Sequence, residues 1–210
     1  MKFKNLEMTG FKSFSEKTSV LIEKGLTGIV GPNGCGKSNI VEALRWCMGE
    51  NSAKSMRGSG MEDVIFSGTS NRPSKNISEV SLLLDNREKD GPIQYKDFEE
   101  ISIKRKIEKD KGSKYYINDK EVRARDVQTF FADLSTGAHS PSLISQGRIG
   151  QLVTAKPIDR KSVLEEAAGI SGLHVRRHEA ELRLNAAENN LKRADAVSYT
   201  HLTLPTIYSV

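Results

Sequence analysis

Short alternations of hydrophobic and polar residues occur throughout the first 120 positions and predict β-strands. They cover residues 3–9, 18–23, 79–84, 100–107 and 114–117. Alternation puts every second side chain on one face, so each strand is expected to be half buried. We expect the first two to flank a turn and the last three to be antiparallel and peripheral.

Residues 26–48 show a different pattern, which predicts a strand, a glycine loop and a helix. Residues 26–30 form a continuous apolar run that is typical of a fully buried strand. Residues 31–38 are rich in glycine, and residues 38–48 carry apolar side chains at helical spacing. Further on, residues 118–120 predict a turn and residues 122–131 a helix.

The remainder is predicted to be a loop followed by helices. Residues 135–150 are rich in Ser, Gly and Pro, so we expect an ordered loop on the working face. Asp159 is a candidate N-cap for a helix that Gly169 and Gly172 interrupt. A longer helix is expected to begin near residue 173.

That longer helix carries a heptad-like seam. Small and apolar residues alternate three- and four-residue steps at Ala180, Leu184, Ala187, Leu191 and Ala194. This spacing predicts the start of a coiled-coil arm, with an ordinary amphipathic helix as the alternative. Residues 198–210 contain no Asp, Glu, Lys or Arg and include the helix breaker Pro205. We interpret them as a non-native tail, so the predicted domains are 1–172, 173–197 and 198–210.

Composition narrows the class of protein. The 210 residues carry a net charge of +5 and a pI near 9.1, which favours a polyanionic partner. Cys35 and Cys47 have neither zinc-site spacing nor a disulfide framework around them, which indicates a reducing cytoplasm. We find no signal peptide, and no apolar run approaches the roughly 18 residues of a membrane span. A cytoplasmic protein with no membrane contact is therefore expected.

The strongest chemical signal is a complete phosphate-binding loop, G-x-x-x-x-G-K-[ST]. It consists of Gly31, Pro32, Asn33, Gly34, Cys35, Gly36, Lys37 and Ser38. Glycines let the backbone approach phosphate, and the following helix points its first N–H groups at the ligand. Lys37 offers a point charge to the terminal phosphates and Ser38 a hydroxyl to Mg²⁺. ATP or GTP is expected here, and Cys35 is expected to be only a small loop residue.

Several segments together resemble the N-terminal region of bacterial SMC proteins (structural maintenance of chromosomes). In order they are GFKSF (10–14), the phosphate loop with Asn39, RW (45–46), GE (49–50), MRG (56–58), MEDVIF (61–66), ISQG (144–147) and EEAAG (165–169). The resemblance spans about residues 1–197. It implies an α/β fold, the N-terminal lobe of an ABC-type P-loop ATPase head with an antiparallel β subdomain, followed by the start of a coiled-coil arm.

The resemblance also implies roles for individual residues. Lys12 and Ser13 are similar to residues that border the nucleotide. Gln146 resembles the glutamine that reaches Mg²⁺ and the attacking water, with an ordinary polar loop residue as the alternative. Arg57 resembles an arginine that approaches the phosphates upon head engagement, with a surface salt bridge as the alternative. Lys37, Gln146 and Arg57 are thus the expected catalytic residues, and Ser38 and Gln146 the expected Mg²⁺ ligands.

Partners follow from the resemblance as well. The family's signature motif, second acidic Walker motif and switch histidine belong to a C-terminal half that this sequence lacks. We therefore expect that half as a partner, a homodimer through a hinge, accessory subunits that bridge the heads, and double-stranded DNA. The implied function is ATP-driven condensation and segregation of chromosomal DNA, with negligible hydrolysis by this chain alone and a chromosome-associated location.

Two weaker patterns leave alternatives open. A basic stretch could contact DNA phosphates or be a solvated strand pair: Lys104, Arg105, Lys106, Lys109, Lys111 and Lys114. Arg176, Arg177 and Arg183 are comparable candidates. His174 and His178 have metal-site spacing, but the intervening arginines argue against a metal.

The rival classes are a RecF- or RecN-like recombination ATPase, a transporter nucleotide-binding domain and a purely structural coiled coil. GFKSF and EEAAG argue against the first, and the inserted charged β region and the arm seam against the second. The complete phosphate loop disfavours the third.

Overall fold

The chain consists of two compact units, Met1–Gly172 and Leu173–Val210. The computed structural model describes residues 1–134, 143, 150, 153–168 and 171–202. Most of the predicted loop over 135–150, including Gln146, lies outside the described residues.

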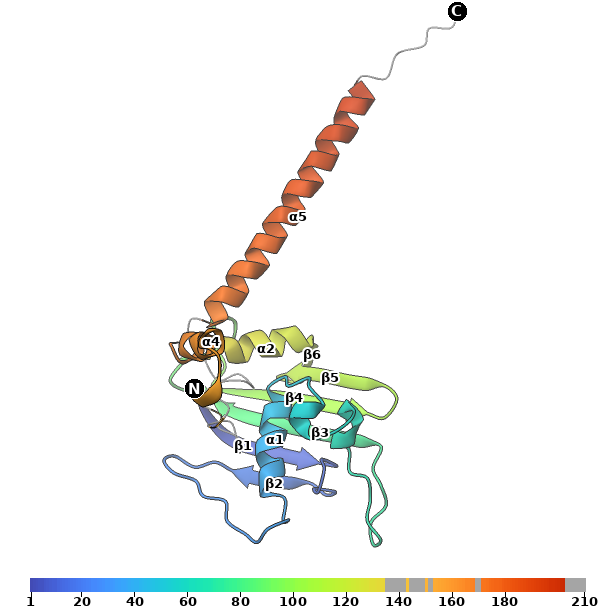
Figure 1. Ribbon diagram of the computed structural model, residues 1–210, viewed down its shortest axis with the longest axis vertical. Helices are drawn as coiled ribbons and strands as arrows, with labels where there is room; N and C mark the ends of the chain where they lie inside the picture. Colours follow the sequence, from blue (N-terminus) through green and yellow to red (C-terminus); the bar gives the residue numbers. More distant parts are fainter. Residues whose placement is uncertain (135–142, 144–149, 151–152, 169–170, 203–210) are drawn as a thin grey trace, which may run out of the picture. The chain divides into compact units, whose positions relative to one another are not determined.

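A six-stranded antiparallel sheet forms the centre of the first unit, in the order β2-β1-β3-β4-β5-β6 (Figure 1). The strands are β1 (Lys2–Thr9), β2 (Thr18–Leu21), β3 (Ile77–Asp85), β4 (Glu100–Glu108), β5 (Gly112–Ile117) and β6 (Lys120–Val122). The alternating pattern thus correctly predicted the antiparallel strands β1 to β5, whereas the short strand β6 was not predicted. Their expected peripheral position was wrong, because the long strands β3 and β4 occupy the middle of the sheet and are paired on both edges.

One face of the sheet is buried and the other meets solvent. In the β3–β4 ladder, Leu82 lies opposite Ile103 and Leu84 opposite Ile101, and all four side chains are buried. Helix α1 (Lys37–Cys47) packs against β3 and β4, and helix α2 (Ala124–Asp133) packs against β5. Each buried aliphatic side chain contributes about 1.5–3 kcal/mol to the free energy of folding. The period-two pattern therefore specifies the face that holds the two helices.

Tight turns position the elements around α1. Gly10 ends β1 with a φ of +64°, and a Cβ there would lie 2.3 Å from the carbonyl oxygen of Ile77. Only glycine allows this close approach, which directs residues 11–15 towards α1. Asn118 and Asp119 have φ of 48° and 60° and join β5 to β6, which confirms the predicted turn.

The predicted buried strand at residues 26–30 was wrong. These residues form no strand, and Leu26 and Val30 are almost fully exposed. A buried strand needs hydrogen-bond partners on its edges, and no strand in the described part of the chain pairs with this segment. The phosphate loop therefore follows an extended, solvent-exposed segment.

The remaining elements in the described ranges are short 3₁₀ helices and two further α-helices. The former are η1 (Lys54–Met56), η2 (Met61–Val64) and η3 (Ile93–Tyr95). Helix α4 (Pro157–Ala167) begins at Pro157, so the N-cap prediction for Asp159 was wrong; proline suits a first helical position because no N–H is needed there.

Helix α5 (Ser171–Leu202) dominates the second unit. It begins at Ser171, two residues before the predicted start. Gly172, which was expected to precede the helix, lies in its first turn. It also continues beyond Val197 and ends three residues before Pro205. The seam residues Leu184 and Leu191 are exposed on it. No helix in the described ranges is long and apolar enough to cross a membrane.

Candidate nucleotide-binding site

The phosphate loop and the first turn of α1 form a set of hydrogen-bond donors. Gly34 and Gly36 have left-handed φ of 85° and 90°, which fold the loop tightly before the helix. Gly36 is the N-cap of α1, with no side-chain cap and no acidic residue in the first turn. The N–H groups of Lys37 and Ser38 are therefore free to face an anion, whereas the N–H of Asn39 donates to the carbonyl oxygen of Gly36.

Lys37 adds a positive charge over this loop. Its Nζ donates hydrogen bonds to the carbonyl oxygens of Gly31 at 2.6 Å and Pro32 at 2.5 Å. The Sγ of Cys35 lies 3.7 Å from the same Nζ. Ser38 is exposed in the first turn of α1. An ammonium, backbone N–H groups and a hydroxyl suit a triphosphate with Mg²⁺.

The turn that contains Lys12 and Ser13 lies beside the loop, although it precedes Gly31 by 18 residues or more in sequence. A Cβ at Gly36 would lie 2.6 Å from the Oγ of Ser13, so the turn after β1 packs directly on the N-cap of α1. Asn39 donates from its Nδ2 to the Oγ of Ser13 at 2.9 Å. The structure thus brings together the phosphate loop, Lys12, Ser13 and Asn39.

Arg57 joins the same cluster from the segment after η1. Its Nη2 donates to the Oδ1 of Asn39 at 3.1 Å, and its Nε forms an ion pair with Glu42. Lys12 pairs with the other carboxylate oxygen of Glu42 and donates to the carbonyl oxygen of Met56. Lys12 and Arg57 both have positive φ, 46° and 55°, a backbone conformation that is uncommon outside glycine and often marks functional sites.

Glu42 was missed by the sequence analysis. Its side chain is only 9% exposed on the inner face of α1. A carboxylate on the apolar face of a helix rarely remains without cationic partners, which is the signal that could have identified it.

Arg105 fits neither alternative for the basic stretch, a DNA contact or a solvated strand pair. The residue is 2% exposed, and its guanidinium stacks between the rings of Trp46 and Tyr115 at 4.5 and 4.6 Å. It donates to the carbonyl oxygens of Trp46 and Glu50 at 2.9 and 2.6 Å, at the C-terminal end of α1. Burial lowers the pKa of Arg105. The period of two puts residue 105 on the inner face of β4, so it cannot reach DNA.

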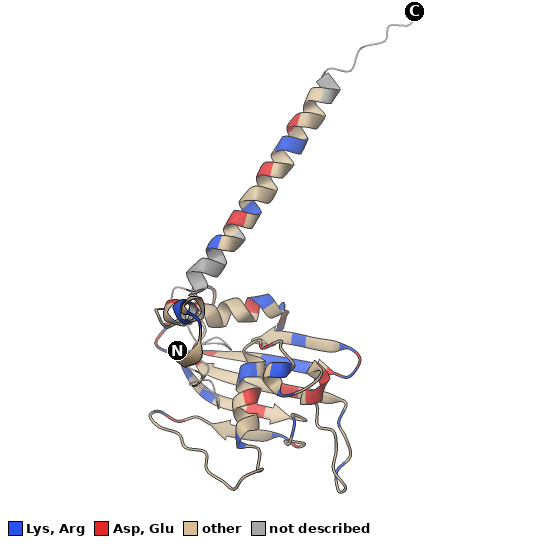
Figure 2. Ribbon diagram, in the orientation of Figure 1, with Lys and Arg blue, Asp and Glu red and all other residues tan. Residues whose placement is uncertain are grey.

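The neighbouring lysines are half-buried or exposed. Figure 2 shows basic and acidic segments interspersed over the first unit. Lys104 pairs with Asp119 at 3.0 Å, and Lys114 with Glu121 at 3.3 Å. On α5, Arg177 pairs with Glu181 at 2.8 Å. In the described part of the chain no group of three or more His, Cys, Asp or Glu residues could hold a metal ion.

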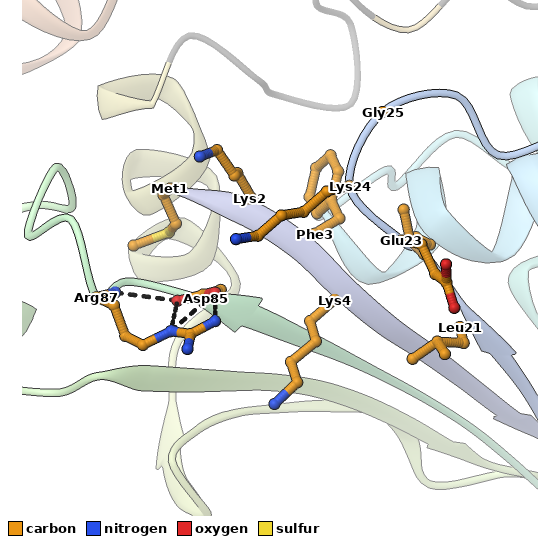
Figure 3. Close-up of a pocket in the computed structure, with 11 residues that line it drawn as sticks. Met1, Lys2, Phe3, Lys4, Leu21, Glu23, Lys24, Gly25, Asp85 and Arg87 are labelled. Atoms are coloured by element: carbon orange, nitrogen blue, oxygen red, sulfur yellow. Dashed lines mark hydrogen bonds and ion pairs between the residues drawn. The ribbon is translucent and has the colours of Figure 1, made fainter.

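A hollow of about 750 Å³ lies elsewhere, beside the start of β1 (Figure 3). Lys2, Lys4 and Lys24 line it, together with the paired Asp85 and Arg87. Asp85 accepts from the Nε of Arg87 at 3.0 Å, and the hydrogen bonds from Arg87 lower the pKa of this carboxyl. None of the predicted site residues that the structure describes lines this hollow.

Comparison with known proteins agrees with this fold. Residues 2–147 match the family described as RecF/RecN/SMC N terminal domain. The chain is 58% identical over 197 residues to the chromosome partition protein Smc of Cereibacter sphaeroides, covering 94% of this chain and 17% of that protein.

Solved structures support the same grouping. A chain from work on ATP-driven dimerization and DNA-stimulated activation of SMC ATPases is 30% identical, with a TM-score of 0.68; the match covers 80% of this chain and 99% of that chain. The Smc head domain of Pyrococcus furiosus, solved with an extended coiled coil and bound to the C-terminal domain of ScpA, is 32% identical with a TM-score of 0.74. This match covers 93% of this chain and 48% of that one.

The fold is that of a P-loop ATPase head of the ABC type. The chain belongs to the RecF/RecN/SMC family, and its structural neighbours are SMC heads. It spans less than a fifth of the length of the chromosome partition proteins that it matches.

Proposed function

We propose that this chain is the ATP-binding N-terminal half of an SMC head, which organises, condenses and segregates chromosomal DNA through cycles of head engagement. The observation that carries the proposal is the cluster around α1. A phosphate loop with uncapped N–H donors and an inward-held Lys37 lies against Lys12, Ser13, Asn39 and Arg57.

Each residue has a task in this proposal. Residues 31–36 and the first turn of α1 donate N–H groups to the phosphates, and Lys37 neutralises their charge. Ser38 and Gln146 would hold a Mg²⁺ ion, which would offset the negative charge of the phosphates. Gln146 orients water, and Arg57 neutralises charge that develops on the phosphoryl group. Lys12 and Ser13 border the nucleotide.

The site is half of a catalytic centre in this proposal. The chain spans 17% of its curated relative, and the apolar segment 26–30 is exposed. We infer that a C-terminal half supplies strand partners for this segment, together with the catalytic glutamate and the opposing signature motif. Two such heads then enclose two ATP molecules, as a homodimer joined through a hinge. The SMC relative that undergoes ATP-driven dimerization supports this arrangement.

Further partners follow from related proteins. ScpA binds the Pyrococcus furiosus head, so we propose an accessory subunit of that kind here. DNA is proposed to bind through phosphate contacts with weak sequence preference, which gives the protein a chromosome-associated place in the cytoplasm. Residues 198–210 are proposed to be a non-native tail, and a chain that ends at Val197 should keep all activities discussed below.

Calorimetry with Mg²⁺ and ATP tests the nucleotide site. Lys37→Ala should weaken ATP binding by about 100-fold, because charge-assisted hydrogen bonds to phosphate are lost, while the thermal melting curve stays unchanged. Lys24→Ala is the matched control, since Lys24 is an exposed lysine that precedes the loop. Equal affinity of the folded Lys37→Ala chain and the unmodified chain would refute the nucleotide site.

Phosphate release tests the half-site. The chain alone should hydrolyse ATP negligibly, and adding the C-terminal half should restore turnover that rises more than linearly with head concentration. In the restored head, Arg57→Ala should reduce turnover more than ATP affinity. Concentration-independent turnover by the chain alone that Lys37→Ala abolishes would show that the site is already complete.

A further inference from the structure

Glu42 is the centre of a ring of polar contacts on one side of α1. Its Oε2 pairs with Lys12 and its Oε1 with the Nε of Arg57. Asn39, one turn earlier on α1, accepts from Arg57 at 3.1 Å and donates to Ser13 at 2.9 Å. The ring therefore connects the turn after β1, the nucleotide-binding helix and the segment after η1 through a single buried carboxylate.

The two cations on this carboxylate differ in exposure. The side chain of Lys12 is 14% exposed, and its Nζ also donates to the carbonyl oxygen of Met56. The side chain of Arg57 is 58% exposed. Exposed ion pairs add little net stability, whereas breaking a buried pair leaves a costly unpaired charge. Arg57 is thus the exchangeable partner and Lys12 the permanent one.

We propose that Glu42 is a positioning residue that holds Arg57 beside the phosphate loop before nucleotide binds and then yields it to the nucleotide phosphates. This inference rests on the proposed ATP site. Because Lys12 stays paired with Glu42, the departure of Arg57 leaves no unpaired carboxylate. Arg57 already lies one hydrogen bond from Asn39, the residue after Ser38, so a small movement separates its two positions.

Nucleotide and Glu42 compete for the same guanidinium in this scheme. Phosphates shift the equilibrium only through their greater affinity for the released Arg57. Weakening the Glu42 contact must therefore free Arg57 in the absence of ATP and have no further effect on it once ATP is bound.

The reactivity of Arg57 towards phenylglyoxal, followed by mass spectrometry of its peptide, tests the hold. Glu42→Gln keeps the shape of the side chain and removes its charge, so modification of Arg57 should become about two- to fivefold faster. Arg87 is an internal control. Its side chain is 63% exposed, and its ion pair is with Asp85 and does not involve Glu42. The matched variant Asp85→Asn should accelerate Arg87 and leave Arg57 unchanged.

Saturating Mg²⁺ and ATP test the release. The rates at Arg57 in the unmodified chain and in Glu42→Gln should converge to one value below that of nucleotide-free Glu42→Gln. If Arg57 is modified at the same rate in the unmodified chain and in Glu42→Gln without ATP, Glu42 does not hold Arg57. If the two rates still differ with ATP bound, nucleotide does not release Arg57 from Glu42. If Glu42→Gln does not fold, Glu42→Asp, which retracts the carboxylate, should accelerate Arg57 in the same way.

Calorimetry on the same samples separates this inference from the ATP site itself. If the unmodified chain binds no ATP, the proposed function fails, and so does the release of Arg57 by nucleotide. The modification rates without ATP still show whether Glu42 holds Arg57. If ATP binds and Lys37→Ala abolishes binding, but Glu42→Gln does not alter Arg57, only the role of Glu42 is refuted.

Discussion

The antiparallel sheet and the segment before the phosphate loop are both apolar in sequence, yet they end in opposite environments. Leu82 in β3 is fully buried, with β1 and β4 hydrogen-bonded on either side and α1 packed against the strand. Leu26, in a run at least as apolar, is fully exposed. This difference shows that an apolar run is buried only where neighbouring elements provide hydrogen-bond partners for its backbone.

The two arginines that face α1 repeat this contrast. Arg105 is fixed between Trp46 and Tyr115 and donates to the end of α1. Arg57 lies near the start of the same helix and is mostly exposed. The C-terminal end of α1 is therefore fastened to the sheet, whereas its N-terminal half, beside the phosphate loop, is contacted by the mostly exposed Arg57.

Cysteine labelling should give the largest contrast between the two regions. Cys35 in the phosphate loop is exposed, whereas Cys47 is buried and burial raises its pKa to about 12. A raised pKa keeps the Cys47 thiol protonated, so at pH 8 iodoacetamide should modify Cys35 about 1,000-fold faster than Cys47. Mass spectrometry measures both rates, and ATP should slow only Cys35. Comparable rates at the two thiols would contradict the difference in packing.

The same leucine substitution in each region should sharpen the comparison. Leu82→Ala should lower the free energy of unfolding by about 3 kcal/mol, because it leaves a cavity in the core. Leu26→Ala should change it by less than about 0.5 kcal/mol. Urea titrations of both variants measure the effect. A large loss from Leu26→Ala would mean that residues 26–30 are already packed in this chain.

Replacing the buried arginine tests how α1 is fastened. Arg105→Lys should cost about 2 kcal/mol, since lysine cannot stack between two rings and serve both carbonyl oxygens of Trp46 and Glu50. Lys106→Arg, on the solvent side of the same strand, is the control and should be near neutral. Urea titration compares them, and equal stabilities would show that the stacked guanidinium is dispensable.

DNA binding should show the smallest effects. Lys106→Ala with Lys114→Ala should weaken DNA binding by the restored head severalfold and reduce its log–log salt slope by about 1.8, which corresponds to two lost phosphate contacts. Lys24→Ala, in the segment before the loop, is the control. Fluorescence anisotropy at several salt concentrations measures the slope. An unchanged slope in the double variant would exclude this face of the sheet.

Several features were predictable because they depend on local sequence. Alternation identified strands β1 to β5, the phosphate loop identified the start of α1, and Asn118-Asp119 identified a turn. Glu42 was not found, because its significance depends on cations from two distant segments. The position of β3 and β4 in the middle of the sheet was also missed, because strand order depends on long-range pairing.

Spacing along the chain was enough to locate the phosphate-loop motif and the apolar face of each predicted strand. Three features became visible only in the folded chain. Arg105 is buried between two aromatic rings, residues 26–30 remain exposed, and one carboxylate links Lys12 to Arg57. These outcomes depend on which segments meet in space. The burial and ion pairing of a side chain depend on the residues around it. When those residues are far away in sequence, only the fold brings them together.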